Sequence, residues 1–160
     1  MIKVKTKLLL SILVISTLFF SACSDSTAST EIARFSPGAI TAYKNGVFIA
    51  EDTLKLKADE PLEIWTEMDY SYEGKQNLLF RVVLFDGEEY LTEFYVDPEK
   101  AKRYETDFKE DRDSLIYRKT NAYNGPFKVE KDSEYNIKVM LMGLKNPSFD
   151  INRADLILKQ

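Results

Sequence analysis

Few side chains in this 160-residue chain could do covalent or acid–base chemistry. The sequence contains no histidine, a single cysteine and 26 aspartate and glutamate residues. Without histidine there is no Ser-His-Asp or Cys-His nucleophile, no histidine general base and no histidine-based zinc site. Pairs of carboxylates could still hydrolyse glycosides, but no motif singles out two acids on neighbouring strands. We therefore predict a non-catalytic protein that carries no cofactor.

One group of acids could offer the hard oxygen ligands that Ca²⁺ prefers. Its members are Asp107, Glu110, Asp111 and Asp113. They lack the glycine and the bidentate glutamate of an EF-hand loop, and a lysine and an arginine interrupt them. A solvated charged face explains this composition better, so we predict no metal site here.

The single cysteine, Cys23, follows a segment with the order of a secretory signal peptide. Lysines carry all the charge of residues 1–7, an apolar run covers residues 8–20, and Ser21 and Ala22 precede the cysteine. A helix over that apolar run would be roughly 20 Å long, too short for a hydrocarbon core of ~30 Å. We therefore expect residues 1–22 to be a cleaved signal peptide rather than a permanent membrane span.

The segment Phe20-Ser21-Ala22-Cys23 resembles the lipobox of bacterial lipoproteins, although phenylalanine stands where leucine is usual. The resemblance implies cleavage before Cys23 and a lipid thioether on its sulfur. Because Ser24 follows rather than aspartate, it also implies transfer to the outer membrane of the cell envelope. Acyl chains that each bury many CH₂ groups, at ~0.8 kcal/mol apiece, would hold the chain on a membrane stably. The alternative is an ordinary signal peptide followed by a free thiol.

Removal of the signal peptide would leave 138 residues and change the net charge from −4 to −7, because three lysines are lost. The small polar residues that follow the cysteine predict a flexible tether over residues 23–34, and residues 35–160 have the length of one domain. An acidic chain is poorly suited to bind nucleic acid or an anionic membrane surface by charge. The lipid on Cys23 is therefore the expected link to the membrane.

The pattern of residues 35–160 has mostly a period of two, which is typical of strands with one buried face. In residues 62–72 the alternation places Leu62, Ile64, Met68 and Tyr70 together and sets Trp65 on the opposite, polar face. About ten short strands of this kind predict an all-β, antiparallel sandwich of the jelly-roll or immunoglobulin-like type.

Two glycine turns predict hairpins within this pattern. Asn45-Gly46 separates residues 39–43 from residues 47–50, and Asp86-Gly87 separates residues 78–85 from residues 90–96. Residues 78–85 are apolar on both faces, which indicates a strand in the middle of a sheet.

The charged segment 97–113 breaks the pattern, because it holds 12 charged residues out of 17. Asp97 could cap a helix with Pro98 at its first position, and Ala101, Tyr104 and Phe108 would then form an apolar stripe. We predict a short helix or a charged loop near residues 98–110 that lies on the sandwich.

The last part of the chain resembles the closing strands of jelly-roll, carbohydrate-binding-like sandwiches. The resemblance rests on residues 125–139, followed by residues 154–158, and covers about a quarter of the mature chain. It implies a fold, and it carries no binding residues over to this chain.

Trp65 is the one tryptophan of the chain. A solvent-facing indole could stack on a sugar ring, with Tyr70, Tyr72 and Tyr123 as further candidate ligand-binding residues. The alternative, which we favour, is that Trp65 packs in a second layer of core or under the charged segment, because large aromatic side chains are usually mostly buried.

These features together predict a lipid-anchored lipoprotein of the cell envelope that acts as a non-catalytic binding or assembly module for a protein partner. A carbohydrate-binding accessory lipoprotein that uses Trp65 and nearby tyrosines is the alternative. A hydrolase built on carboxylates alone is less favoured. The side of the outer membrane that the domain faces, periplasm or exterior, stays open.

Overall fold

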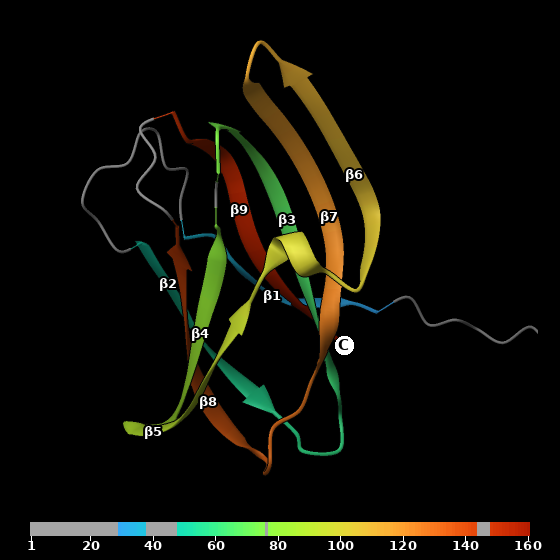
Figure 1. Cartoon of the computed structure of the whole chain (residues 1–160). Coiled ribbons are helices and arrows are strands. Elements are labelled where there is room, and N and C mark those ends of the chain that lie inside the picture. The colour runs from blue at the N-terminus through green and yellow to red at the C-terminus, as the bar shows by residue number, and fades with distance from the viewer. Residues whose placement is uncertain (1–28, 38–47, 76, 144–147) are drawn as a thin grey trace, which may run out of the picture.

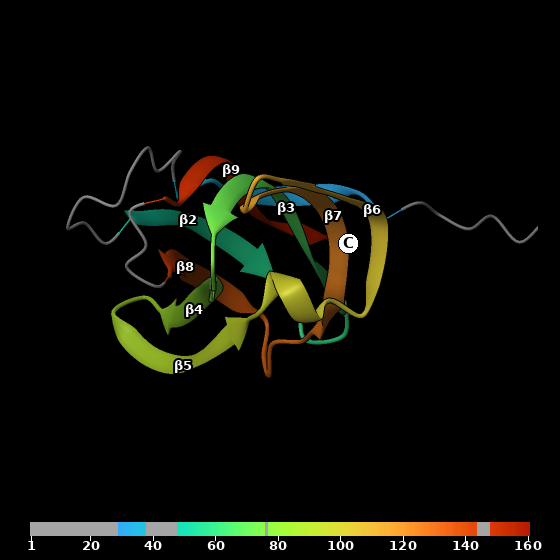
Figure 2. The ribbon, with the colours of Figure 1, turned by 45° about the horizontal axis from the view of Figure 1, so that its top comes forward.

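The computed structural model describes residues 29–37, 48–75, 77–143 and 148–160. In these ranges nine strands form two antiparallel sheets that pack face to face, so the predicted all-β sandwich is confirmed (Figures 1 and 2). The five-stranded sheet has the order β1 (Glu31–Phe35), β9 (Asp150–Lys159), β3 (Leu62–Glu73), β7 (Leu115–Phe127), β6 (Arg103–Arg112). The four-stranded sheet has the order β2 (Phe48–Leu56), β8 (Ser133–Met142), β4 (Leu79–Asp86), β5 (Glu89–Val96).

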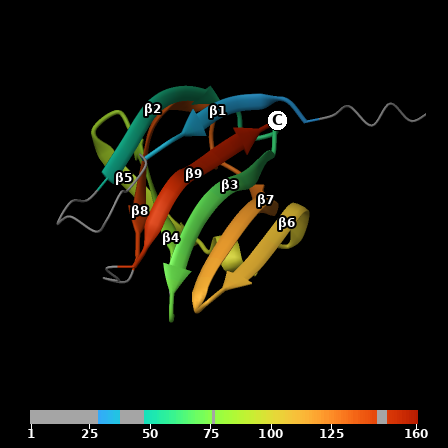
Figure 3. The ribbon, with the colours of Figure 1, turned by 90° about the horizontal axis from the view of Figure 1, so that it is seen from above.

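The strand pairs are nested: the first strand pairs with the last, and each later pair lies inside the one before it in the sequence. Strand β1 pairs with β9, β2 with β8, β3 with β7 and β4 with β5, all antiparallel. This nested order is that of a jelly roll rather than of an immunoglobulin domain. Strand β6 is an addition to it, since it pairs with β7 at the edge of the five-stranded sheet (Figure 3).

The core lies between the sheets, where the alternating pattern predicted it. In β3, the side chains of Leu62, Ile64, Met68 and Tyr70 are buried in it. They meet the alternate residues of β8 and β9, which are buried as well. Strand β4 is flanked by β8 and β5, so its predicted place inside a sheet is confirmed.

The predicted hairpin at Asp86-Gly87 is confirmed. Strands β4 and β5 pair up to Asp86 and Glu89, and Gly87 takes the left-handed φ of +61° that a glycine adopts without steric cost. The other predicted hairpin, at Asn45-Gly46, lies outside the described residues.

The charged segment is a strand and not a helix over most of its length. Asp97 does cap a helix that has Pro98 in its first turn, but this 3₁₀ helix, η1 (Pro98–Lys100), ends after three residues. Strand β6 follows and turns into β7 through Asp113 and Ser114, both with positive φ. Its charges suit an edge strand, because charged side chains discourage pairing with another chain.

The sandwich also begins earlier than residue 35, because β1 starts at Glu31 within the predicted tether. The strand is held there by β9, and Thr30 and Gln160 exchange backbone hydrogen bonds of 2.6 and 2.8 Å. The rest of the tether, Cys23 and the signal segment lie outside the described residues. Among the residues that are described, no helix has the length and apolarity needed to cross a bilayer.

Candidate functional site

Trp65 lies on the outer face of the five-stranded sheet, as predicted, but its side chain is only 2% exposed. The ring packs 5.6 Å from that of Tyr123, and the Nζ atom of Lys159 lies 4.0 Å from the indole centroid. The guanidinium of Arg103 covers both rings, at 5.4 Å from each centroid. The indole Nε1 donates to Glu63 at 2.9 Å. Covered in this way, the indole cannot stack on a sugar, so the packing interpretation describes Trp65 better.

Tyr70 and Tyr72 point the other way, into the sandwich, where both are buried. Their rings stack with centroids 5.8 Å apart, and the Tyr70 hydroxyl donates to Glu99 of η1. Burial, followed by the hydrogen bond to Glu99, raises the pKa of Tyr70. The four aromatic candidates therefore divide between two faces of the sheet and do not form one site.

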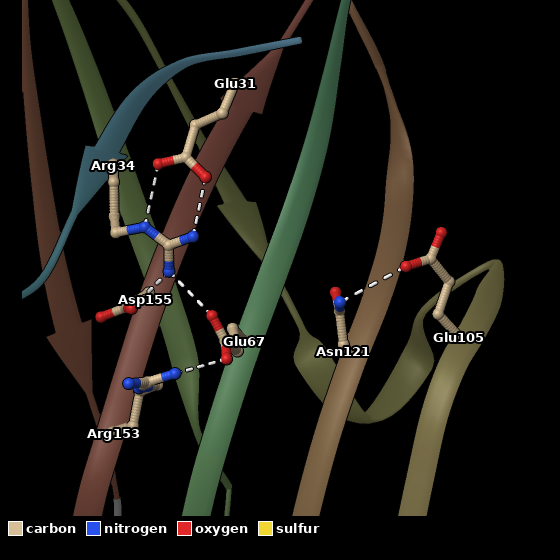
Figure 4. Close-up of polar contacts among 7 residues, drawn as sticks. All are labelled: Glu31, Arg34, Glu67, Glu105, Asn121, Arg153 and Asp155. Atoms are coloured by element: carbon tan, nitrogen blue, oxygen red, sulfur yellow. Dashed lines mark hydrogen bonds and ion pairs between the residues drawn. The ribbon is translucent and has the colours of Figure 1, made fainter. Parts of the chain in front are cut away.

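The outer face of the five-stranded sheet carries a charge network centred on Arg34 of β1 (Figure 4). One guanidinium nitrogen donates to Glu67 of β3 at 2.8 Å and to Asp155 of β9 at 2.7 Å. The other two donate to Glu31 at 3.0 and 2.7 Å, and Arg153 donates to the second oxygen of Glu67. These contacts join three strands whose residues lie far apart in the sequence.

The network satisfies its own charges. Burial of Glu67 favours the neutral carboxyl, but hydrogen bonds from Arg34 and Arg153 outweigh burial and hold the pKa below its usual range. The carboxylates of Glu31, Glu67 and Asp155 in turn raise the pKa of Arg34, with Glu31 the largest cause. An open hollow of about 550 Å³ lies here, yet its charged groups already bind one another.

Two carboxylates do converge in this network, since Glu67 and Asp155 face each other in register. A glycosidase would need one of its two acids to be protonated, with a raised pKa. The pKa of Glu67 is lowered instead, and both acids bind the guanidinium of Arg34. These observations favour a role of the two carboxylates in stability rather than in catalysis.

Farther along the same face, the amide of Asn121 and the carboxylate of Glu105 are 3.4 Å apart (Figure 4).

Three of the acids weighed as Ca²⁺ ligands, Asp107, Glu110 and Asp111, lie on β6, and the fourth, Asp113, lies in the turn that follows it. Asp107 accepts a hydrogen bond from Arg118 at 3.1 Å, and Glu110 accepts one from Arg112 at 2.7 Å. In the part of the chain that the structure describes, no three acids or cysteines come together as metal ligands.

The outer face of the four-stranded sheet is different, because it exposes more large apolar side chains than the other outer face, where the described residues expose Phe108 and Leu115. Strand register places Ile49, Met140, Arg81 and Tyr95 in one row across all four strands. The side chains of Ile49 and Tyr95 are 54% and 52% exposed. We refer to this row and its apolar neighbours as the Tyr–Met face; the neighbours are Leu79, Val83, Phe85, Tyr90 and Met142.

Charged residues cross the Tyr–Met face in two pairs. Arg81 donates through Nε to Glu93 at 3.0 Å, and the Tyr95 hydroxyl donates to the other oxygen of Glu93 at 3.2 Å. Lys138 lies 3.4 Å from Glu51 and 5.2 Å from the centre of the Phe85 ring. Tyrosine, methionine and arginine around apolar patches are the residue types enriched where proteins bind one another.

Sequence reasoning missed the Tyr–Met face as a site, although one signal was present. The residues of β4 are apolar on both faces, which predicted a central strand; part of that second apolar face belongs to this surface. The remaining residues come from β2, β5 and β8, and only the strand order brings them together.

Comparisons with protein-family models, with curated proteins and with solved structures find no match to this chain. Its function is therefore inferred from its sequence and its surfaces.

Proposed function

We propose that the protein is a lipid-anchored lipoprotein of the cell envelope and that its sandwich is a non-catalytic module that binds a protein partner through the Tyr–Met face. The observation that carries the proposal is the exposure of Ile49, Tyr90, Tyr95 and Met142 on one outer face. Contiguous exposed apolar surface on a soluble domain is typical of an interaction site. The anchor itself is supported by the lipobox-like segment that ends at Cys23.

The place where the tether joins the sandwich fits this arrangement. Ser29 donates from its hydroxyl to Glu63, on the outer face of the five-stranded sheet, at 2.9 Å. Strand β1, which follows, belongs to the same sheet. A tether that leaves from this side leaves the Tyr–Met face, on the opposite sheet, free for a partner.

Intact-mass measurement of the full chain from membranes tests the anchor. A mature chain that begins at Cys23 and carries acyl groups is the expected result, and Cys23→Ser should release the protein from the membrane fraction. An unmodified thiol, or a wild-type protein that stays soluble, would contradict the anchor.

Photo-crosslinking in the native host tests the partner. A photoreactive amino acid in place of Tyr95 or Ile49 should yield one discrete heterologous adduct. The same amino acid in place of Lys119, on the outer face of the other sheet, is the matched control and should yield none. Equal adducts from both faces, or none from either, would reject the Tyr–Met face as the binding surface.

Carbohydrate binding keeps one specific observation in its favour. Tyr90 and Tyr95 are both more than half exposed, so they offer the open aromatic rings that Trp65 does not. Glycan-array binding that is lost in Tyr90→Ala and Tyr95→Ala would support this alternative over a protein partner.

A further inference from the structure

Two adjoining hollows open beside the free edge of the four-stranded sheet, between β5 and the end of β7. The larger is a groove of about 690 Å³ with mostly apolar walls, among them Leu91, Phe127 and Val129. The smaller, of about 310 Å³, has both polar and apolar walls, and we call it the polar hollow because its lining includes Lys102. Both volumes are in the range, or at its lower limit, that small-molecule sites occupy.

Phe94 connects the two hollows, because it lines both of them together with Ile64 and Pro126. Its ring packs against Phe127 with the centroids 5.1 Å apart. Phe94 is half-buried and lies at the edge of the core. An elongated ligand could therefore pass along this ring from the apolar groove into the polar hollow.

The polar hollow presents the ammonium group of the exposed Lys102 beside Gly125. A Cβ atom added to Gly125 would lie 3.1 Å from the Nζ atom of Lys102, so the missing side chain leaves the room that this lysine occupies. Gly125 has a φ of +147°, which also favours glycine there. Among the described residues, no carboxylate forms an ion pair with Lys102.

The charge around the two hollows is positive in an acidic chain. Their lysines are Lys100, Lys102, Lys128 and Lys131. The neighbouring acids are Asp97 and Glu130, which line the hollows, and Asp86, which pairs with Lys131 at 2.5 Å. Four lysines against three acids leave a surplus of one positive charge, whereas the whole chain carries −4.

We propose that this double hollow binds a single-chain amphiphile with one carboxylate head group, such as a fatty acid. The alkyl chain would lie in the groove between Leu91, Phe127 and Val129. The carboxylate would pass Phe94 and pair with the Lys102 ammonium over Gly125. This site adjoins the Tyr–Met face at Tyr95, which also lines the smaller hollow, but it does not depend on the protein partner proposed for that face.

Photo-labelling of the full chain in phospholipid nanodiscs tests the proposal, with a diazirine-bearing decanoate as the probe. Labelled residues should map to the walls of the groove, and unlabelled decanoate should compete. Octanoate should compete roughly fifteenfold more weakly, because each CH₂ that is buried changes affinity by roughly fourfold. The same alkyl chain with a trimethylammonium head group should compete poorly.

Two pairs of variants locate the ligand. Lys102→Gln should weaken decanoate binding by about tenfold, whereas Lys119→Gln, an exposed lysine on another face, should leave it unchanged. Leu91→Glu should abolish labelling, and Leu115→Glu is its control, since the two leucines are 39% and 37% exposed. The proposal would be overturned if the label mapped outside the groove, or if the carboxylate and the trimethylammonium ligands competed equally. It would also be overturned if a variant and its control changed binding equally. Circular dichroism of each variant separates loss of binding from loss of fold.

Discussion

The outer faces of the two sheets are built by the same alternation of side chains and differ in how their polar groups are satisfied. On the five-stranded sheet, Arg34 binds three carboxylates from three strands, and the largest aromatic ring, Trp65, is covered by cations and a tyrosine. On the four-stranded sheet, two charge pairs lie among exposed tyrosine, isoleucine and methionine.

The difference indicates which face is free to bind. A partner that docked on the five-stranded sheet would have to break hydrogen bonds between charged groups that already satisfy one another, at a cost in free energy. A partner on the Tyr–Met face would bury apolar surface that water now contacts, which is favourable. Substitutions on the first face should therefore change stability, and substitutions on the second should change binding.

Trp65→Ala should have the largest effect on stability. The substitution removes a buried indole together with its contacts to Tyr123, Arg103 and Lys159, and should cost about 3–5 kcal/mol of unfolding free energy. Urea unfolding followed by circular dichroism measures this cost. A loss below about 1 kcal/mol would mean that the indole is not packed as described.

Trp65→Phe separates packing from sugar stacking. Phenylalanine keeps part of the packing, but it has a smaller ring and lacks the indole N–H that Trp65 donates to Glu63. A variant that stays folded and loses a glycan interaction would return Trp65 to the binding role that its burial argues against.

Arg34→Met should have the second-largest effect on the free energy of unfolding. It leaves the carboxylates of Glu31, Glu67 and Asp155 without their shared guanidinium and should cost about 1–2 kcal/mol, a value reduced by the partial exposure of the pair. Arg112→Met is the matched control, because Arg112 is exposed and pairs only with Glu110 in the described part of the chain. Its cost should stay within about 0.5 kcal/mol. Equal costs would show that the network adds nothing beyond an ordinary surface pair.

Acidification should weaken the same face. Hydrogen bonds from Arg34 lower the pKa of Glu31, one from Trp65 lowers that of Glu63, and those from Arg34 and Arg153 overcome burial to lower that of Glu67. A carboxyl whose pKa is lower in the folded state stabilises the fold above its unfolded pKa, and this stabilisation is lost as the pH falls through the folded pKa. The urea midpoint should therefore drop below a pH of about 4.5, the usual glutamate pKa. Glu67→Gln should flatten that dependence, and an unchanged slope would contradict the assignment.

The alternation of residues predicted the parts of this fold that depend on local pattern. Strand β3 alternates cleanly, so both its buried face and the outward position of Trp65 followed from the sequence. The strand conformation of β6 did not follow from the sequence. Tyr104 and Phe108 are four residues apart, a spacing that fits one face of a helix as well as one face of a strand. Pairing with β7 decided in favour of the strand.

The two surfaces that matter most depend on pairing between distant segments. Arg34 reaches Glu67 and Asp155 only because β1 pairs with β9, and the segment around Arg34 reads as part of a tether in isolation. The Tyr–Met face likewise needs the order β2, β8, β4, β5. Alternation tells which residues share a face of one strand, but strand order cannot be obtained from it.

Substitutions on the Tyr–Met face should have the smallest effect on stability. Tyr95→Ala removes an exposed side chain and Met140→Ala a half-buried one, and both lie outside the core, so each should change the unfolding free energy by about 1 kcal/mol or less. The same two changes, introduced into the chain with the photoreactive group at Ile49, should remove most of the heterologous adduct, because residues near the centre of an interface carry most of its binding energy. Lys119→Ala on the opposite face should leave both quantities unchanged. A contrary result would be that Tyr95→Ala unfolds the domain while the fraction that stays folded still forms the adduct. Tyr95 would then contribute to stability rather than to binding. In that case the contrast between a stabilising face and a binding face would be wrong.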